Sequence, residues 1–228
     1  MLKRIYDICF ALLFGVLTLP VLAFAYIGIK IASPGPAIYR AERIGKDGRP
    51  FTLYKFRSMV VNSGPIRTTT LADDDRVFGF GRLLRRSKID ELPQLFNVLK
   101  GEMSVVGPRP EDAANAQKIY VGRYLDLLRL KPGLTSPASL FDYTHGEHYA
   151  SQQQYEAEFL PIKLEMELYY AQHASFAYDL ALTLRTAGII LCVLFGKQQF
   201  PFPREYGAVI AKIKGRGEEA DYELEPTR

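Results

Sequence analysis

Two adjacent carboxylates, Asp90 and Glu91, stand out among the residues that could do chemistry. They follow a basic cluster of Arg85, Arg86 and Lys88 and precede an apolar run. A carboxylate can attack a phosphoryl group, but two negative groups must then approach each other, so cations or a divalent metal have to screen them. The pattern therefore suggests an acidic nucleophile beside a site for a hard metal ion.

A purely structural interpretation of the acid pair is also available. Pro93 favours the first turn of a helix, which makes Asp90 the N-cap, or places it third in a helix capped by Ser87. Both frames put Asp90 at the positive end of the helix dipole, and the neighbouring cations add to this effect. We therefore expect Asp90 to be ionised at neutral pH. A helix cap alone would not need three cations beside it.

Further cations could bind phosphate oxygens. Arg109 lies between two prolines, and its planar guanidinium can bind two phosphate oxygens at once. A stiffened loop without any ligand explains the Pro-Arg-Pro turn equally well. Lys55 and Arg57 alternate along a predicted strand, residues 51–59, and taken alone they are typical of a solvated strand face.

The N-terminus must place this site at a membrane. Residues 8–29 carry no charge and are about long enough to cross a bilayer. The run is long for a signal peptide and no cleavage site follows it, so we expect it to be retained. Basic residues flank both ends, and Pro20 predicts a kink at which Thr18 could bond a freed carbonyl. These residues allow two geometries equally, a helix that dips into one leaflet and returns, or a single-pass anchor.

The remaining pattern predicts a hairpin and several helices. Asp47-Gly48 is a tight-turn signal between two strand-like segments. The apolar segment 176–195 contains Asp179 and Arg185, which argue against a second span and favour a core or interface helix. Further helices are predicted over residues 76–86 (at a membrane interface), 92–99 (ended by Gly101), 113–130 and 155–173, with a polar loop over 62–75 and a frayed, charged tail from 212 onward.

Composition narrows the class of protein but does not define it. The chain has 228 residues and a net charge of +4, enough for one domain with a sizeable core. The modest basic excess suits anionic lipids, phosphorylated substrates or nucleic acid alike. Nucleic acid is the weakest of these, because the cations gather around an acid pair and an apolar segment. Cys9 and Cys192 are predicted to be buried thiols, and no zinc-binding motif occurs.

Taken together, the motifs resemble the bacterial sugar transferase family, monotopic phosphoglycosyl transferases that act on polyprenyl phosphate. The resemblance extends to about Phe195 and rests on Lys3-Arg4 with Asp7, SPGPAIYRAERIGKDGRPF, LYKFRSM, DDRVFGFGRLLRRSKIDELPQLFNVLKGEMSVVGPRPE and LKPGLT. It implies that a UDP-sugar donates its sugar-1-phosphate to polyprenyl phosphate such as undecaprenyl phosphate, with release of UMP. It also implies a re-entrant N-terminal helix that enters one leaflet, broken at Pro20.

The resemblance assigns functions to individual residues. Asp90 corresponds to the nucleophile that forms a phosphosugar-aspartyl intermediate, and Glu91 to its partner beside the required Mg²⁺, so both are the expected metal ligands. Residues expected to bind phosphate or substrate are Arg85, Arg109, Lys55, Arg57 and Lys131.

The chain also departs from the family pattern. Leu19 stands where members often have a serine before the proline of the helix break. Residues 136–147 differ from the usual segment, which leaves the identity of the sugar open. His145 and Glu147 could touch substrate there, and a surface loop is the simpler interpretation.

We therefore predict an α+β fold: a mainly helical, membrane-associated domain with a small β-hairpin and a re-entrant membrane helix. The expected divisions are residues 1–32 for that helix, 33–200 for the catalytic domain and 201–228 for the tail. This minimal catalytic form is expected at the cytoplasmic face of a bacterial inner membrane. Its expected partners are a UDP-sugar, polyprenyl phosphate and membrane lipid, but no nucleic acid, and a homodimer is left open. The alternatives are a glycosyltransferase that moves the sugar without its phosphate and a scaffold for polyprenyl-linked intermediates.

Overall fold

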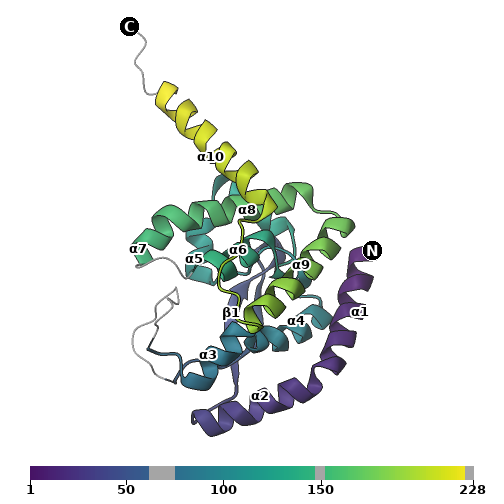
Figure 1. Cartoon of the computed structure of the whole chain (residues 1–228). Coiled ribbons are helices and arrows are strands. Elements are labelled where there is room, and N and C mark those ends of the chain that lie inside the picture. Colours follow the sequence, from purple (N-terminus) through teal and green to yellow (C-terminus); the bar gives the residue numbers. More distant parts are fainter. Residues whose placement is uncertain (62–74, 147–151, 224–228) are drawn as a thin grey trace.

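Helices dominate the computed structural model, which describes residues 1–61, 75–146 and 152–223 (Figure 1). This confirms a mainly helical chain with a small sheet; the predicted loop 62–75 lies almost wholly outside the described residues. The elements in chain order are α1 (Leu2–Leu17), α2 (Leu19–Ala32), β1 (Ile38–Ile44), η1 (Lys46–Gly48), β2 (Pro50–Phe56), α3 (Gly79–Arg86), η2 (Ile89–Gln94), α4 (Leu95–Lys100), β3 (Ser104–Val106), α5 (Ala113–Ile119), η3 (Gly122–Arg129), β4 (Gly133–Thr135), α6 (Pro137–His145), α7 (Gln152–Gln154), η5 (Tyr155–Phe159), α8 (Leu160–His173), α9 (Phe176–Leu194) and α10 (Arg204–Glu223).

The predicted hairpin is confirmed. Strands β1 and β2 pair antiparallel, from Ile38 opposite Phe56 to Ile44 opposite Pro50. Asp47 and Gly48 have φ angles of 58° and 73°, a left-handed conformation that glycine and aspartate tolerate best. The hairpin is thus closed by the two residues whose sequence signalled the turn.

Helix α4 is tied to the hairpin by one buried side chain, Asn97. Its Nδ2 donates to the carbonyl oxygen of Thr52 at 2.7 Å and to Glu102 Oε2 at 2.8 Å, and its Oδ1 accepts from the N–H of Tyr54 at 3.2 Å. A buried amide with its donors and acceptor in use fixes the position of both elements. Gly101, at φ 84°, ends α4 as its sequence predicts.

A second, parallel pair of strands was not predicted. Ser104 of β3 lies opposite Gly133 of β4, and Val106 opposite Thr135. The chain continues this contact beyond the strand, because Gly133 N–H donates to the Pro108 carbonyl at 2.9 Å. A side chain at Gly133 would collide with the backbone of Gly107, so the close approach requires glycine.

The N-terminal apolar segment is broken as predicted. Helices α1 and α2 are bent by 61° at Thr18, and Pro20 lies in the first turn of α2, where its missing N–H is tolerated. The Thr18 hydroxyl donates to the Phe14 carbonyl at 2.6 Å, a back-bond that favours helix bending. By length and apolar composition, α9 could cross a membrane, and so could the bent pair if it formed one span.

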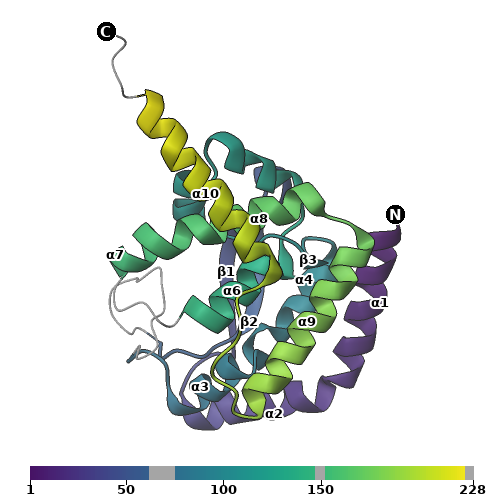
Figure 2. The same cartoon turned by 45° about the horizontal axis from the view of Figure 1, so that its top comes forward.

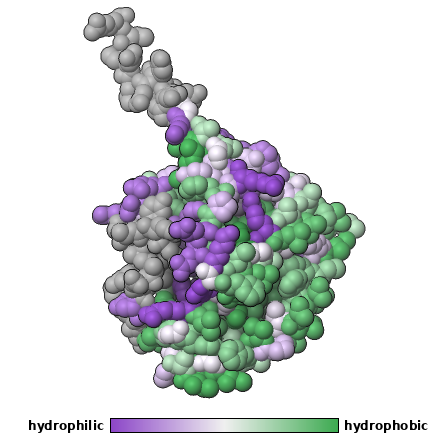
Figure 3. All heavy atoms as spheres, in the orientation of Figure 1, coloured by the Kyte–Doolittle hydropathy of each residue, from purple (hydrophilic) through white to green (hydrophobic). Residues whose placement is uncertain are grey.

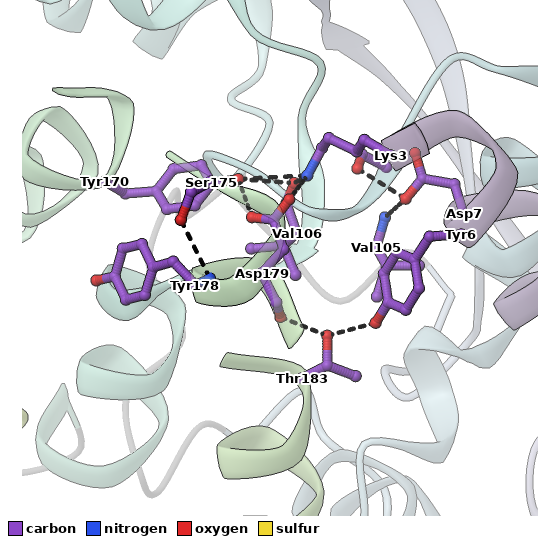
Figure 4. A network of polar contacts seen from close by, with 11 residues as sticks. Lys3, Tyr6, Asp7, Val105, Val106, Tyr170, Ser175, Tyr178, Asp179 and Thr183 are labelled. Carbon is purple, nitrogen blue, oxygen red and sulfur yellow. Dashed lines mark hydrogen bonds and ion pairs between the residues drawn. The ribbon is translucent and has the colours of Figure 1, made fainter. Parts of the chain in front are cut away.

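Charged residues of α1 bind it to the body of the protein (Figure 4). Lys3 Nζ donates to the Val106 carbonyl at 2.9 Å and forms an ion pair with Asp179 of α9. Asp7 is buried, and its Oδ1 accepts from Ser104 Oγ and Val105 N–H, both at 2.9 Å. Helix α1 is therefore joined to both β3 and α9.

Arg4 caps the end of α4. Its NH1 donates to the Val98 carbonyl at 2.6 Å and its NH2 to the Leu99 carbonyl at 2.8 Å. The last carbonyls of a helix have no partner within it, and its C-terminus attracts positive charge. The guanidinium satisfies both requirements at once.

Helix α9 is not a core helix, so that alternative is wrong. It lies alongside α1 in two views (Figures 1 and 2), and only 11% of its apolar stretch is buried inside the protein. Its two charged residues are both paired, Asp179 with Lys3 and Arg185 with Glu205. Pairing allows an otherwise apolar helix to contain them.

Exposed apolar side chains gather over one side of the molecule, which Figure 3 shows as continuous green over the region of α1, α2 and α9. Large exposed apolar surfaces commonly mark sites of interaction with a membrane or with another protein. Exposed apolar residues in and beside these helices include Leu13, Val16, Leu17, Phe24, Ile31, Leu184, Leu191 and Phe195.

Four other expectations were wrong. The helix predicted over 113–130 is broken between α5 and η3, where Gly122 has a φ of 53°. Residues 204–223, largely assigned to a charged, frayed tail, form α10. Residues 137–145, interpreted as a surface loop, form α6. Cys9 and Cys192 are exposed on apolar helix faces.

Replacing Asp7 tests the attachment of α1. Asp7→Ala leaves the buried Ser104 hydroxyl and Val105 N–H without an acceptor, so we expect the free energy of unfolding to fall by about 1–3 kcal/mol. Urea unfolding of the protein in detergent measures this free energy. Asp126→Ala, at an exposed ion pair, is the matched control and should change it by less than about 0.5 kcal/mol. Equal stability of both variants would contradict the assigned function of Asp7.

Candidate active site

A cavity of about 2190 Å³ brings most of the predicted site residues together. Asp90 and Glu91 line it from η2, Arg85 from α3, Lys55 from β2, and Arg109 from the segment after β3. These residues are up to 54 positions apart in the chain. The hairpin, η2 and the β3–β4 pair are the elements that assemble them.

A sharp turn of the chain positions the acid pair. Ser87 ends α3, with its hydroxyl donating to the Leu83 carbonyl at 2.7 Å, and Lys88 then adopts a left-handed conformation at φ 57°. Asp90 and Glu91 follow in the 3₁₀ turn η2, which contains Pro93 and precedes α4. Both expected frames for an α-helical N-cap are therefore wrong, because the α-helix begins only at Leu95.

Asp90 is buried and incompletely bonded. The residue is only 4% exposed, and its Oδ1 has no hydrogen-bond partner among the described residues. Burial raises the pKa of Asp90, Glu91 raises it further, and Lys55, Lys88 and Arg85 only partly oppose them. The expectation that the surroundings favour the ionised form is therefore wrong in direction, because it left out burial and the second acid.

The pKa of Glu91 shifts in the opposite direction. Burial disfavours its charged form, but Lys88, Arg109 and Lys55 outweigh burial and lower its pKa to about 2. Arg109 NH2 donates to Glu91 Oε1 at 3.1 Å, and Lys88 Nζ lies 3.8 Å from the same oxygen. The ion pair in turn raises the pKa of Arg109. One acid of the pair is thus a fixed anion, and the other retains an unbonded oxygen.

Lys55 and Arg85 line the same cavity as Asp90. Lys55 is half-buried, with Nζ 5.6 Å from the centre of the Tyr39 ring. Burial lowers its pKa, which the charges of Asp90 and Glu91 oppose. Both cations lie near enough to Asp90 to influence its ionisation, so they can also attract an anionic ligand placed against it.

Arg57 also lines this cavity, but its guanidinium is already bonded to protein, and Lys131 lies elsewhere. Arg57 is buried, and its Nε, NH1 and NH2 donate to the Pro36 carbonyl, the Ser33 hydroxyl and the Ser33 carbonyl at 2.6–2.7 Å. These hydrogen bonds hold in place the segment 33–36, which follows α2. Lys131 lies near Arg4 and is not among the described residues that line the cavity. The assignment of both to substrate binding stays a prediction.

Sequence reasoning missed a second charged group in the same cavity. Lys163 of α8 is buried, pairs with Asp142 of α6 at 3.5 Å and donates to Tyr155 Oη at 3.2 Å. The cations Lys163, Arg109 and Lys88 outweigh burial and lower the pKa of Asp142. No local pattern marked these residues, because they meet only through the packing of α6 on α8.

Glu167 supports Arg109 from behind. Its Oε1 accepts from the backbone N–H of Arg109 at 3.1 Å and from Ser136 Oγ at 2.9 Å. Burial raises its pKa to about 7 against the effect of these bonds. His145 stacks on Phe202 at 4.8 Å and does not line the cavity among the described residues; Glu147 lies outside those residues.

The acid pair fits a magnesium ion. Magnesium is usually held by one or two carboxylates together with substrate phosphate oxygens and waters. Asp90 and Glu91 offer two adjacent carboxylates, and Asp90 Oδ1 is a buried oxygen still without a bond. Among the described residues there is no cluster of three or more His, Cys, Asp or Glu side chains suited to a metal.

Comparison with known proteins identifies the family of this chain. The family model for bacterial sugar transferases matches residues 1–193. The chain is 37% identical over 192 residues to a UDP-glucose:undecaprenyl-phosphate glucose-1-phosphate transferase of Caulobacter vibrioides, covering 83% of this chain and 69% of that protein. It is 36% identical over 189 residues to the Escherichia coli protein of the same name, covering 82% and 39%.

A third relative carries a different sugar in its name. The UDP-N-acetylgalactosamine-undecaprenyl-phosphate N-acetylgalactosaminephosphotransferase of Aeromonas hydrophila is 36% identical over 197 residues, covering 83% of this chain and 44% of that protein. The chain thus spans less than half the length of two of these relatives. It belongs to the bacterial sugar transferase family.

The raised pKa of Glu167 makes a prediction about stability. The unfolded chain ionises this group near pH 4.5 and the folded chain near pH 7, so its protonated form stabilises the fold below pH 4.5, and that contribution is lost as the pH rises through 7. Glu167→Gln mimics the protonated form. We expect its stability to fall less between pH 5 and pH 8 than that of the wild type, by about 1–3 kcal/mol in urea unfolding.

Exposed Glu158 provides the matched control, since Glu158→Gln makes the same chemical change on the surface. That variant should keep the pH dependence of the wild type. A Glu167→Gln variant with an unaltered pH dependence would contradict the placement of a protonatable carboxyl behind Arg109.

Proposed function

We propose that this protein transfers a sugar-1-phosphate from a UDP-sugar to undecaprenyl phosphate or a similar polyprenyl phosphate. The observation that carries the proposal is Asp90, a buried carboxylate with a free oxygen, in a cavity lined by Arg85, Lys55 and Arg109. The names of its relatives support the same substrates. We place the reaction at the first membrane step of a bacterial glycoconjugate pathway, such as one for exopolysaccharide.

The first half-reaction forms a covalent intermediate. A carboxylate oxygen of Asp90 attacks the phosphorus that bears the sugar, and a bond forms between that oxygen and the phosphorus. The bond from this phosphorus to the bridging oxygen of the diphosphate breaks, and UMP leaves with the electron pair. Burial keeps Asp90 poorly solvated, and donor binding must supply the conditions under which it acts as an anion.

The second half-reaction regenerates Asp90. A phosphate oxygen of polyprenyl phosphate attacks the same phosphorus, the aspartyl–phosphorus bond breaks, and the carboxylate is restored. The product is the polyprenyl-diphosphate sugar. Both half-reactions bring an anion toward a phosphorylated centre, so the cations that line the cavity with Asp90 stabilise charge in both.

Glu91 is proposed to position cations for the phosphates, and not to attack phosphorus itself. Its ion pairs with Arg109 and Lys88 keep it anionic and fix those cations beside the phosphates. Asp90 and Glu91 would hold Mg²⁺, which supplies charge screening for the phosphates when bound. Arg109 is held on both sides, by Glu91 at its guanidinium and by Glu167 at its backbone.

We propose that the exposed apolar faces of α1, α2 and α9 lie in the inner membrane, with the cavity on the cytoplasmic side. Both ends of the bent α1–α2 pair contact the same protein body, through Lys3 at one end and through Ser33, bound by Arg57, at the other. This supports a re-entrant segment over a single crossing. Departure from the family's serine at Leu19 does not remove the bend.

Nucleotide release tests the proposed reaction. With undecaprenyl phosphate, Mg²⁺ and a panel of UDP-sugars, the wild type should release UMP, and the panel identifies the sugar. Asp90→Asn, which keeps the shape of the side chain but weakens its nucleophilicity, should lower turnover by at least about 10³-fold while remaining folded. Asp126→Asn, an exposed position, is the control and should keep normal turnover.

The other outcomes point to different functions. Release of UDP would indicate a glycosyltransferase that moves the sugar alone. Near-normal turnover of Asp90→Asn would leave Asp90 without a nucleophilic function. Binding of polyprenyl phosphate with no turnover of any donor would favour a scaffold.

Labelling of engineered cysteines tests the topology. Cys9 and Cys192 are exposed and must first be replaced by alanine. Single cysteines at positions 2 and 46 should then both react with a membrane-impermeant reagent from the cytoplasmic side only. Reaction from opposite sides of the membrane would refute the re-entrant geometry.

A further inference from the structure

The segment that follows α9, residues 196–203, leads from α9 to α10 and is here called the strap. It lies beyond residue 193, where the family match ends. Gly196, at φ 90°, turns the chain at the end of α9, and Lys197 N–H donates back to the Cys192 carbonyl at 2.9 Å. Figures 1 and 2 show the strap running back past α6 toward the base of α10.

The strap is fixed at its far end. Glu205, the second residue of α10, is buried and accepts from both terminal nitrogens of Arg185, at 3.1 and 2.9 Å, and from the Tyr178 hydroxyl at 2.6 Å. Phe202 stacks on Tyr206 at 4.1 Å as well as on His145. Helix α6 and the strap are therefore packed together as neighbouring walls.

Part of the strap faces the active-site cavity. Lys197, Gln198 and Phe200 line it, whereas the intervening Gln199 does not. Lys197 Nζ lies 5.1 Å from the centre of the Phe200 ring. The strap thus presents a cation, an amide and an aromatic ring to the space that holds Asp90.

A series of contacts joins the start of the strap to the acid pair. Lys88 lies between Glu91, at 3.8 Å, and the Tyr143 ring, at 4.5 Å. The Tyr143 hydroxyl donates to the Arg86 carbonyl, and Arg86 NH2 donates to the Val193 carbonyl at the end of α9 at 3.3 Å. A ligand whose phosphates lie beside Lys88, the cation paired with Glu91, would therefore extend toward the strap.

We propose that the strap binds the nucleoside part of the donor, with Phe200 stacking on the base and Gln198 bonding to its polar edge. Proteins commonly recognise single pyrimidine bases in this way, by an aromatic face together with hydrogen bonds to the edge. A uracil ring offers both carbonyl and N–H groups, which match the two kinds of atom in a glutamine amide. Lys197 adds charge for the nucleotide phosphate. This inference rests on the proposed use of a UDP-sugar.

UMP is the probe that tests the strap, because its binding does not depend on knowing the sugar. Titration calorimetry on the full chain in detergent should show that Phe200→Ala and Gln198→Ala weaken UMP binding by about tenfold each. Phe200→Tyr should restore binding, since it keeps the ring. Gln199→Ala, the matched control on the same segment, should bind UMP as the wild type does.

Kinetics separate the strap from the chemistry. In Phe200→Ala and Gln198→Ala, the KM for the UDP-sugar should rise by about the same factor as the dissociation constant of UMP. The KM for polyprenyl phosphate and kcat should stay within about twofold of the wild-type values. Unchanged UMP affinity in both variants would overturn the proposal, even if the wild type releases UMP. A raised donor KM with unchanged UMP affinity would overturn it too, by placing the sugar at the strap. Release of UDP by the wild type would instead refute the proposed function.

Discussion

The attachment of α1 to the body of the protein is the constraint on which the cavity depends. Arg4 caps α4, the helix that directly continues the turn containing Asp90 and Glu91. Asp7 bonds to β3, the strand that leads to Arg109. One helix from the apolar side thus positions both segments that carry the charged site. Because these bonds use buried charged and polar groups, losing any one leaves a partner unsatisfied, which costs more than the bond itself contributes.

Electrostatic asymmetry gives the two acids different properties although they are neighbours in sequence. Glu91 receives a direct bond from Arg109, so its charge is compensated despite burial. Asp90 is more deeply buried and lacks such a bond at Oδ1. Burial is the larger influence on Asp90 and the cations the larger influence on Glu91. A site of this kind keeps one oxygen available for reaction by giving the neighbouring bonds to the other acid.

Sequence predicted the features that depend on local backbone chemistry. Asp47-Gly48 turns the hairpin, Gly101 ends α4, and Pro20 marks the break between α1 and α2. The family resemblance predicted seven catalytic and substrate-binding residues, and six of them line one cavity; Lys131 is the exception among the described residues. The parallel β3–β4 pair could not be predicted, because strands of three residues carry no periodic signal and meet across a long separation. Lys163 and Asp142 were not predicted for a similar reason, since only tertiary packing brings them together.

Arg57 shows the limit of residue type as evidence, because its guanidinium is fully occupied by the backbone and hydroxyl of the 33–36 segment.

The proposed topology of the N-terminal segment follows from the same contacts that build the cavity. For α1 to cross the bilayer, Lys3 would have to leave Asp179, a residue only 2% exposed, and Asp7 would have to leave the buried backbone of β3. Separating Lys3 from Asp179 would be destabilising, because the buried carboxylate would lose its cation. The bend at Thr18 removes this conflict, since it lets the apolar middle of the segment point away while both ends stay on the body. The proposed membrane geometry and the position of Asp90 would therefore be coupled through α1, so that a change that straightens the helix should disturb the cavity before it disturbs membrane attachment.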